Sequence, residues 1–244
     1  MVVALGAGIG IGIWIAPTSP GSVARATLHN AIAAGIHAGT YHYVEDSRTD
    51  GVRDDIVGTA APSSGRQIIT ESGKSGTDVF DLRLVDGIVY FRGNEAAVVD
   101  QLGVSSANAP QVSGTWVKVT RKASVYHTFE EGITTRSNMS QLATVMVPDS
   151  TANLPNATIP TTQVLGGVIV GPHDQTAGVA RLDVRTSTSL PTTLQARAAD
   201  QATGASITMS WTFSRWKEHV SVPAPSKSTP FASLGARPST SGGG

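Results

Sequence analysis

Side chains with catalytic potential are spread along this chain without the spacing that catalysis or metal binding needs. None of the six histidines stands four residues from another, the spacing at which two histidines on one helix share a metal ion. The chain has no cysteine, which excludes disulfides, thiolate catalysis and cysteine-bound zinc or iron–sulfur centres. We therefore expect no metal site and no cofactor, and interpret the histidines as ordinary surface or core residues: His29, His37, His42, His127, His173 and His219.

Two other patterns have the residue types of a catalytic centre in the wrong arrangement. Ser214 and Lys217 match a Ser-x-x-Lys nucleophile, but that chemistry places both residues on one turn of a helix. Here they lie in an alternating stretch that predicts a strand, where residues three apart point to opposite faces. The acid pairs at 54–55 and 130–131 are adjacent, and neighbours on a strand or helix diverge, so neither is a carboxylate dyad. The sequence therefore predicts that the protein is not an enzyme.

The composition gives no sign of a nucleic-acid partner. The formal net charge is +0, whereas the phosphate backbone selects proteins with a basic excess or patch. Hydrophobic residues make up 40% and charged residues 15% of the 244 residues. This is enough apolar material for a sizeable core, in one larger domain or two small ones, and leaves an unusually uncharged surface.

The two ends of the chain differ in composition from the middle. Residues 2–16 carry no charge, and as a helix these fifteen residues would span about 22 Å, less than the roughly 30 Å of a bilayer core. With the Pro/Ser/Gly linker that follows, they predict a signal peptide or signal anchor over 1–21, and an extracytoplasmic location at the cell membrane or cell envelope. The alternative is a buried strand or helix of the domain. Residues 227–244 are rich in Pro, Ser and Gly and predict a disordered tail, which leaves one domain over 22–226.

The most regular stretch of the chain is 77–93. Asp86 and Gly87 stand between two alternating apolar runs, which predicts a hairpin with a two-residue type I′ turn. This turn pairs Val85 with Ile88 and fixes the register of the strands on both sides. One face of the hairpin then carries only apolar side chains, namely Phe80, Leu82, Leu84, Val89 and Phe91.

The polar face of this hairpin, with Asp81 opposite Arg92, is expected to meet solvent. A second stretch, 205–225, alternates as cleanly and predicts the last strand of the domain. Trp216 is an odd number of residues from the inward-facing positions, so it is either a rim residue or evidence of a β-bulge. The apolar face of the last strand carries Ile207, Met209, Trp211 and Phe213.

The remaining patterns predict segregated helices and strands. Helices are expected over 23–39, capped by Ser22, over 94–103, capped by Asn94, and over 128–147 as one or two segments. A Pro-rich loop is expected over 148–160. The other expected strands cover 40–46, 51–61, 66–70, 113–121, 162–171, 178–188 and 190–200. Runs of antiparallel strands with separate helices imply an α+β fold.

The order of these elements resembles the LolA-like superfamily, in particular the LppX/LprG-type envelope lipoproteins. The likeness covers about residues 22–226. Its closing strands contain Leu190-Pro191 and the Phe213-Ser214-x-Trp216 element of the last strand. The other residues that carry it are "GTYHYVED" (39–46) after an N-terminal helix, "FDLRLVDGIVYFRG" (80–93), "GTWVKV" (114–119) and "VLGGVIVG" (164–171).

The resemblance implies a strongly curved antiparallel sheet, an incomplete barrel, with helices over its open, concave side. It further implies an apolar cavity between sheet and helices that holds a lipid or acylated molecule, for storage or transfer across the cell envelope. The partners would be this ligand, the membrane through the N-terminal segment, and envelope proteins that the sequence does not identify. No lipobox cysteine is present, which excludes an acylated anchor. The ligand-binding residues would be Phe80, Leu82, Leu84, Val89, Phe91, Ile207, Met209, Trp211 and Phe213.

The residues themselves leave a second hypothesis open. The same fold with a filled core would be a non-catalytic interaction or sensor module. Small residues on the expected covering helix, Ala31, Ala34 and Gly35, would leave room for a ligand. However, alanine-rich helices also pack tightly against sheets without voids.

Overall fold

The computed structural model describes residues 20–73, 76–153, 162–170, 176–200 and 204–234. Within these residues a first helix precedes a run of strands, a group of helices follows, and a second run of strands completes the domain. This is the α+β order that the sequence predicts.

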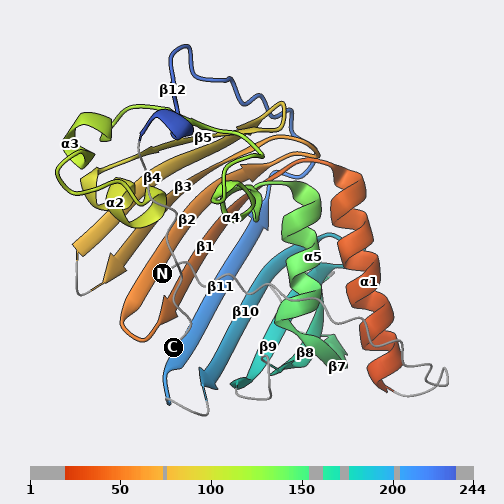
Figure 1. Cartoon of the computed structure of the whole chain (residues 1–244). Coiled ribbons are helices and arrows are strands. Elements are labelled where there is room, and N and C mark those ends of the chain that lie inside the picture. Colours follow the sequence, from red (N-terminus) through yellow and green to blue (C-terminus); the bar gives the residue numbers. More distant parts are fainter. Residues whose placement is uncertain (1–19, 74–75, 154–161, 171–175, 201–203, 235–244) are drawn as a thin grey trace.

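The first half of the chain begins with helix α1 (Pro20–Ala38), which lies across the sheet (Figure 1). Five consecutive strands follow it as an antiparallel meander. They are β1 (Tyr41–Thr49), β2 (Val52–Ala60), β3 (Gly65–Gly73), β4 (Gly76–Val85) and β5 (Ile88–Gly93).

The middle of the chain is mostly helical, with one short strand, β6 (Val117–Val119), at the edge of the sheet. Its helices are α2 (Glu95–Leu102), α3 (Ala109–Val112), α4 (Tyr126–Glu130) and α5 (Thr135–Val145). Gly132 adopts a positive φ of 79° between α4 and α5, so the single or double helix expected over 128–147 is two helices.

The second half of the chain returns to the sheet. Its strands are β7 (Val147–Asn153), β8 (Thr162–Val170), β9 (Thr176–Arg185), β10 (Pro191–Asp200), β11 (Ser206–Ser214) and β12 (Thr229–Pro230), with the short helix η2 (Phe231–Ser233) at the end. Strand β7 occupies part of the segment for which the sequence predicted a Pro-rich loop, and it pairs with β8 through a register shift beside Pro148.

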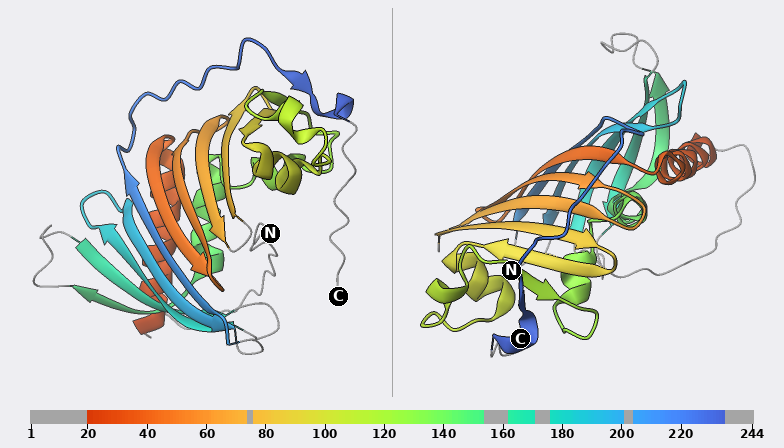
Figure 2. Two further views of the ribbon diagram at one scale, coloured as in Figure 1. Left: turned by 90° about the vertical axis from the view of Figure 1, so that its left-hand side faces the viewer. Right: turned by 90° about the horizontal axis from the view of Figure 1, so that it is seen from above.

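All twelve described strands belong to one sheet, in the order β12-β6-β5-β4-β3-β2-β1-β11-β10-β9-β8-β7. Every pairing is antiparallel except that of β12 with β6. The sheet curves strongly without closing into a barrel, and α1 and α5 lie side by side across its concave face (Figures 1 and 2). Helices α2, α3 and α4 lie over the β4–β6 end of the same face (Figure 1). The predicted half-barrel with a covered concave side is therefore confirmed.

The predicted hairpin forms with the expected register. Val85 pairs with Ile88 and Leu82 pairs with Phe91, and all five residues of the apolar face are buried. The turn at Asp86 and Gly87 has positive φ at both positions, 52° and 71°, as a type I′ turn requires.

The expectation that the hairpin's polar face meets solvent is wrong. Asp81 is only 5% exposed, because Arg66 forms two hydrogen bonds to its carboxylate (3.1 and 2.8 Å) and Arg83 and Arg92 lie within 3.5 Å of it. The guanidinium groups of Arg83 and Arg92 in turn lie over the ring of Trp116, 4.4 and 4.7 Å from its centroid. These arginines and the indole shield the carboxylate from water.

The helix ends agree in part with the sequence analysis. Asn94 caps α2 by accepting a hydrogen bond from the Ala97 amide, and Gly103 ends the helix with a left-handed φ of 67°. Helix α1 begins at Pro20, so Ser22 lies inside its first turn and is not the predicted N-cap.

The last predicted strand, 205–225, is too long. Strand β11 ends at Ser214, because Arg215 and Lys217 take positive φ values of 50° and 67° and turn the chain away from the sheet. Within this turn the ring of Trp216 stacks on Tyr41, with centroids 4.6 Å apart. Trp216 is thus an inward-facing residue of a turn, which neither sequence alternative described.

A C-terminal strap, which we define as residues 218–234, connects β11 to the far edge of the sheet (Figure 2). On its way it contacts the outer face of β4, where Arg83 donates a hydrogen bond to the Pro223 carbonyl (3.2 Å). It then adds β12 beside β6, and Phe231 and Leu234 pack against buried residues. The disordered tail predicted over 227–244 is therefore wrong for 227–234, because these residues pair and pack.

Residues 1–19 of the predicted leader (1–21) lie outside the described residues. Residues 235–244, the rest of the predicted tail, also lie outside them. Among the helices that the structure does describe, none combines the length and apolar character needed to cross a membrane.

Buried side chains form two clusters on the concave face. The first core lies between α1, α5 and strands β1 and β8–β11, and includes Tyr41, Leu142, Leu182, Trp211 and Phe213. The second core lies between α2–α4 and strands β4–β6, and includes Leu84, Phe91, Leu102, Tyr126 and Phe129.

Candidate ligand-binding cavity

An inner cavity of about 180 Å³ lies on the concave face where the two cores meet. The strands that line it are β1–β4 and β11, and their period of two directs alternate side chains to the concave face. Phe80 and Leu82 come from the second core, while Met209 and Trp211 come from the opposite side. The apolar floor of the cavity consists of Ile56, Ile69, Phe80, Leu82, Met209 and Trp211.

The cover of the inner cavity comes from α4, α5 and the turn between them. Residues that line it from this side are Thr128, Phe129, Gly132, Asn138, Gln141 and Val145. The first turn of α5 is held to the ends of the sheet, because Thr135 donates through its amide to the Ala61 carbonyl (3.0 Å) and through its hydroxyl to the Gly39 carbonyl (2.6 Å). On its other side Met139 contacts α1 at Gly35, where a larger residue would require the Met139 side chain to move.

Three polar groups at the inner end of the cavity satisfy one another. The Tyr43 hydroxyl donates to the Gly132 carbonyl (3.0 Å), and Gln67 Nε2 donates both to that hydroxyl and to the same carbonyl (2.6 Å each). The Tyr43 ring covers Gly58 so closely that a larger residue there would collide with it. Burial raises the pKa of Tyr43 well above its usual range, so the phenol is neutral.

Two further polar groups in the wall of the cavity lack a hydrogen-bond partner among the described residues. Asn138 is fully buried, and neither its Oδ1 nor its Nδ2 has a partner at hydrogen-bond geometry. Trp211 is 2% exposed, and its Nε1–H is also unpaired. Unpaired buried polar atoms also occur away from the cavity, at the Tyr41 hydroxyl, Asp54 Oδ1, Arg83 Nε and Trp216 Nε1, so they are not a property of this cavity alone.

An acidic row begins at the edge of the inner cavity and runs across the concave face. Desolvation and the charge of Asp54 raise the pKa of Glu45, which lines the cavity, to about 7. Asp54, Glu71 and Asp78 occupy directly opposed positions on β2, β3 and β4. Burial and the like charges around them raise the pKa of each of these carboxyl groups, so all four acids hold protons more strongly than in water.

The structure divides the nine residues for which the resemblance implied ligand contact. Phe80, Leu82, Met209 and Trp211 line the inner cavity. Leu84, Val89 and Phe91 lie in the packed second core, Phe213 lies in the first core among aromatic rings, and the half-buried Ile207 lies farther along β11.

Sequence reasoning missed the polar residues of this cavity. Glu45, Gln67 and Asn138 lie on two strands and a helix that are far apart in the chain, and only the fold brings them to one wall. A usable signal existed at Gln67 and Glu45, because each is polar at a position where the period of its strand points inward.

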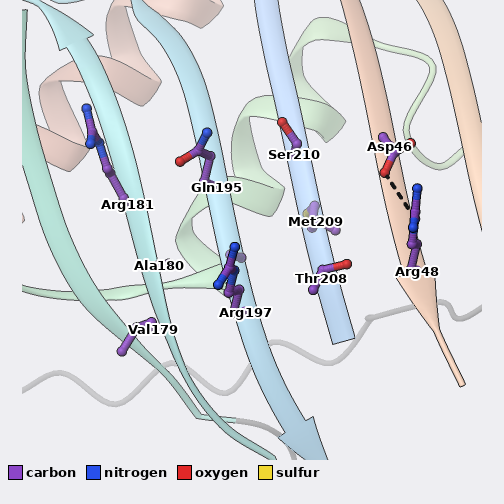
Figure 3. Close-up of a pocket in the computed structure, with 11 residues that line it drawn as sticks. Asp46, Arg48, Val179, Ala180, Arg181, Gln195, Arg197, Thr208, Met209 and Ser210 are labelled. Atoms are coloured by element: carbon purple, nitrogen blue, oxygen red, sulfur yellow. Dashed lines mark ion pairs between the residues drawn. The ribbon is translucent and has the colours of Figure 1, made fainter. Parts of the chain in front are cut away.

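A second hollow, the outer trough, lies on the opposite face of the sheet and measures about 620 Å³ (Figure 3). In Figure 3 Arg48, Arg181 and Arg197 project from the outer side of β1, β9 and β10, while Met209 lies behind the ribbon. Arg181 forms an ion pair with Asp183 (2.8 Å), and Arg48 lies 3.8 Å from Asp46. The wall of this trough carries three arginines, whereas none of the described residues that line the inner cavity is Lys, Arg or His.

No described group of three or more histidine, aspartate or glutamate side chains is arranged to hold a metal ion. The two residues of the Ser-x-x-Lys pattern lie in different local structures. Ser214 is the exposed last residue of β11. Lys217 lies in the turn that follows, where its backbone amide donates to the Thr40 carbonyl (2.9 Å). The pair therefore spans a strand end and a turn, not a helical turn.

Comparison with known proteins places the fold. No protein-family model and no curated protein matches the chain. Among solved structures, the chain is similar to the crystal structure of LprF from Mycobacterium bovis, with 12% identity, a TM-score of 0.52, and coverage of 85% of this chain and 99% of that one. At this identity the likeness concerns the fold alone, and it supports the curved half-barrel with a helix-covered concave side that the sequence predicted.

Proposed function

We propose that the protein is a non-catalytic carrier that holds a lipid or acylated molecule in the inner cavity. The observation that carries this proposal is an apolar cavity at the junction of two cores, beneath the helices that cover the concave face. Each methylene that a ligand buries there contributes about 0.8 kcal/mol. The half-barrel fold supports the proposal, since it covers a concave apolar face with helices.

The size of the cavity limits how a ligand is held. At about 180 Å³ it is smaller than the roughly 300–1,000 Å³ usual for small-molecule pockets. The cavity as it stands has room for about six methylenes, at roughly 30 Å³ each, which suits a short acyl chain or the end of a longer one. A larger lipid would have to displace the cover formed by α4 and α5, whose anchored end is the first turn of α5.

We further propose that the carrier works outside the cytoplasm, in the cell envelope, with residues 1–21 as signal peptide or anchor and the domain beginning near residue 22. The uncharged stretch 2–16 and the linker after it support this. A fusion of alkaline phosphatase after residue 30 should be active. Inactivity of this fusion, beside an active fusion to a known exported leader, would contradict the export proposal and leave the cavity proposal untouched.

The carrier proposal is tested by lipid extraction and native mass spectrometry of protein from its host, together with one pair of variants. Leu82→Trp fills the cavity, so it should weaken binding of a fluorescent fatty-acyl probe at least tenfold while changing stability by less than about 1 kcal/mol. Leu84→Trp, two residues along the same strand, overpacks the filled second core and should cost about 1–3 kcal/mol.

A filled-core interaction module predicts a different result. Both tryptophan variants would then lose similar stability, and the wild-type protein would neither bind the acyl probe nor carry co-purified lipid. That result would replace the carrier proposal by the module.

A further inference from the structure

We propose that the inner cavity takes an amphiphile with an aliphatic amine at its polar end, and that the carboxylate of Glu45 pairs with the ammonium group. This inference rests on the proposed carrier function and names the class of ligand. The hydrocarbon chain would cover the apolar floor of the cavity, and the ammonium group would lie at Glu45.

The first observation is the position of Glu45 in an otherwise apolar row. The strand register places Glu45 on β1 directly between Trp211 on β11 and Ile56 on β2. The same row continues with Ile69 on β3 and Phe80 on β4. All five residues line the inner cavity, and Glu45 is the only ionisable member of the five. A chain lying along this row therefore has one charged group beside it.

The second observation is that a ligand can reach the Glu45 carboxyl group. Glu45 is partly exposed, and so are Ile56, Ile69 and Met209 of the cavity floor, although all four face the concave side. No described residue donates a hydrogen bond to this carboxyl group, and its pKa reflects burial and the like charge of Asp54 alone. A partly desolvated carboxylate without a donor gains more from a cationic partner than an exposed one does.

The charges around Glu45 favour a cation over an anion. The ionisable groups that share this part of the concave face with it are Asp54 on β2, Glu131 between α4 and α5, and the neutral phenol of Tyr43. None of the described residues that line the cavity is a cation that would offset these acids. A carboxylate or phosphate would be repelled here. An ammonium group would relieve the repulsion between Glu45 and Asp54, whereas a hydroxyl group would only donate one hydrogen bond.

An inorganic cation fits this position less well than an amine. No described group of three or more acids or histidines is arranged to hold a metal ion, and the strand neighbours of Glu45 are apolar. An alkylammonium ion has three N–H donors on an apolar chain. One donor can pair with Glu45 and the others can stay hydrated, because Glu45 is only partly buried.

The test compares three probes of equal chain length, octylamine, octanol and octanoate, by titration calorimetry at pH 8 and pH 5. At pH 8, above the Glu45 pKa of about 7, the amine should bind at least about tenfold more tightly than the alcohol, as a charge-assisted hydrogen bond provides. Octanoate should bind more weakly than the alcohol. At pH 5 the carboxyl group is protonated while the amine keeps its charge, so the preference for the amine should fall below about threefold.

Two variants assign the preference to one carboxylate. Glu45→Gln should abolish both the preference for the amine and its pH dependence, while its affinity for octanol stays nearly unchanged and shows that the cavity is intact. Glu131→Gln is the matched control, because it removes the same charge from an exposed position at the edge of the cavity. Since solvent and salt screen an exposed charge, this variant should keep most of the preference.

The outcomes separate this inference from the carrier proposal. Equal binding of octylamine and octanol by the wild-type protein at pH 8 would overturn the inference and leave the carrier proposal standing. A preference that survives in Glu45→Gln, or that is lost equally in Glu131→Gln, would overturn the role of Glu45. Failure of all three probes to bind would overturn the carrier proposal as well.

Discussion

The two faces of the sheet carry hollows of opposite character. The outer trough is the larger, about 620 Å³ against about 180 Å³, and its wall includes Arg48, Arg181 and Arg197. Its acids have partners, since Asp46 pairs with Arg53 (2.6 Å) and Asp183 pairs with Arg181. The inner cavity is smaller, and its lining is mostly apolar.

This difference shows that the volume of a hollow is a poor guide to its use. Exposed ion pairs contribute about 0–1 kcal/mol each, and an exposed guanidinium is already solvated, so the outer trough has little free energy to give to a ligand. On the concave face, by contrast, each methylene that a ligand buries against the apolar floor contributes about 0.8 kcal/mol. The free energy available for binding is therefore on the concave face.

The largest expected effect tests the assignment of the faces on one strand. Trp211→Asp places a charge in the first core and should cost about 4 kcal/mol or more, enough to unfold the domain or abolish ligand uptake. Thr212→Asp, on the exposed outer face one residue later, should change stability by no more than about 0.5 kcal/mol. Thermal unfolding of both variants measures the difference. Similar losses in both would mean that the two faces are not distinct.

The next largest effect on stability is expected at Asp81, a buried carboxylate on the otherwise exposed outer face of the sheet. Asp81 is buried beneath three arginines, so Asp81→Asn should cost about 2 kcal/mol, less than for a fully buried pair because the arginines remain partly exposed. Asp46→Asn breaks an exposed pair and should cost less than about 1 kcal/mol. Urea unfolding would compare them. A silent Asp81→Asn would show that the outer face is uniformly solvent-like, as the sequence suggested.

Asp81 also shows where sequence reasoning stops. The register of the β4–β5 hairpin could be predicted because the turn at Asp86-Gly87 and the period of two are local properties. The burial of Asp81 could not, because Trp116 and Pro223 reach this face from distant parts of the chain. The end of β11 was missed for another reason, since Arg215 and Lys217 take positive φ without being glycine.

The candidate site divides in the same way. The apolar floor at Leu82 and Trp211 follows from strand alternation and could be predicted. Whether an inward-facing residue lies in a packed core or in the cavity depends on which part of the sheet α4 and α5 cover. That coverage is a property of the three-dimensional packing and not of the local sequence. For this reason Leu84 and Phe91, identical in pattern to Leu82, lie in a filled core.

A smaller effect should appear as a pH dependence of the inner face. Burial raises the pKa of Glu45 from 4.5 to about 7, so the folded protein keeps a proton that the unfolded chain releases. The free energy of unfolding should therefore fall as pH rises from about 4.5 to about 7. Glu45→Gln should equal wild type at pH 4 and exceed it by about 1–3 kcal/mol at pH 8.

Urea unfolding at the two pH values measures this effect. Thr144→Val in the wall of the same cavity gives the control, because it changes no ionisable group, and it should differ from wild type by the same amount at both pH values. If Glu45→Gln gains no more at pH 8 than at pH 4, the Glu45 carboxyl is solvated and the inner wall is wetter than the structure indicates.

The smallest expected effect is on the outer trough. The cross-strand neighbours of Arg197 are Val179 and Thr208, so Arg197→Gln leaves no acid without a partner and should change stability by less than about 0.5 kcal/mol. Arg181→Gln removes the partner of Asp183, which is 22% exposed, and should cost slightly more, up to about 1 kcal/mol. Neither substitution should change the Kd of an acyl probe, because the sheet separates both arginines from the inner cavity. A tenfold loss of probe affinity in Arg197→Gln would show that the ligand reaches the outer face, and the contrast between the two hollows would then fail.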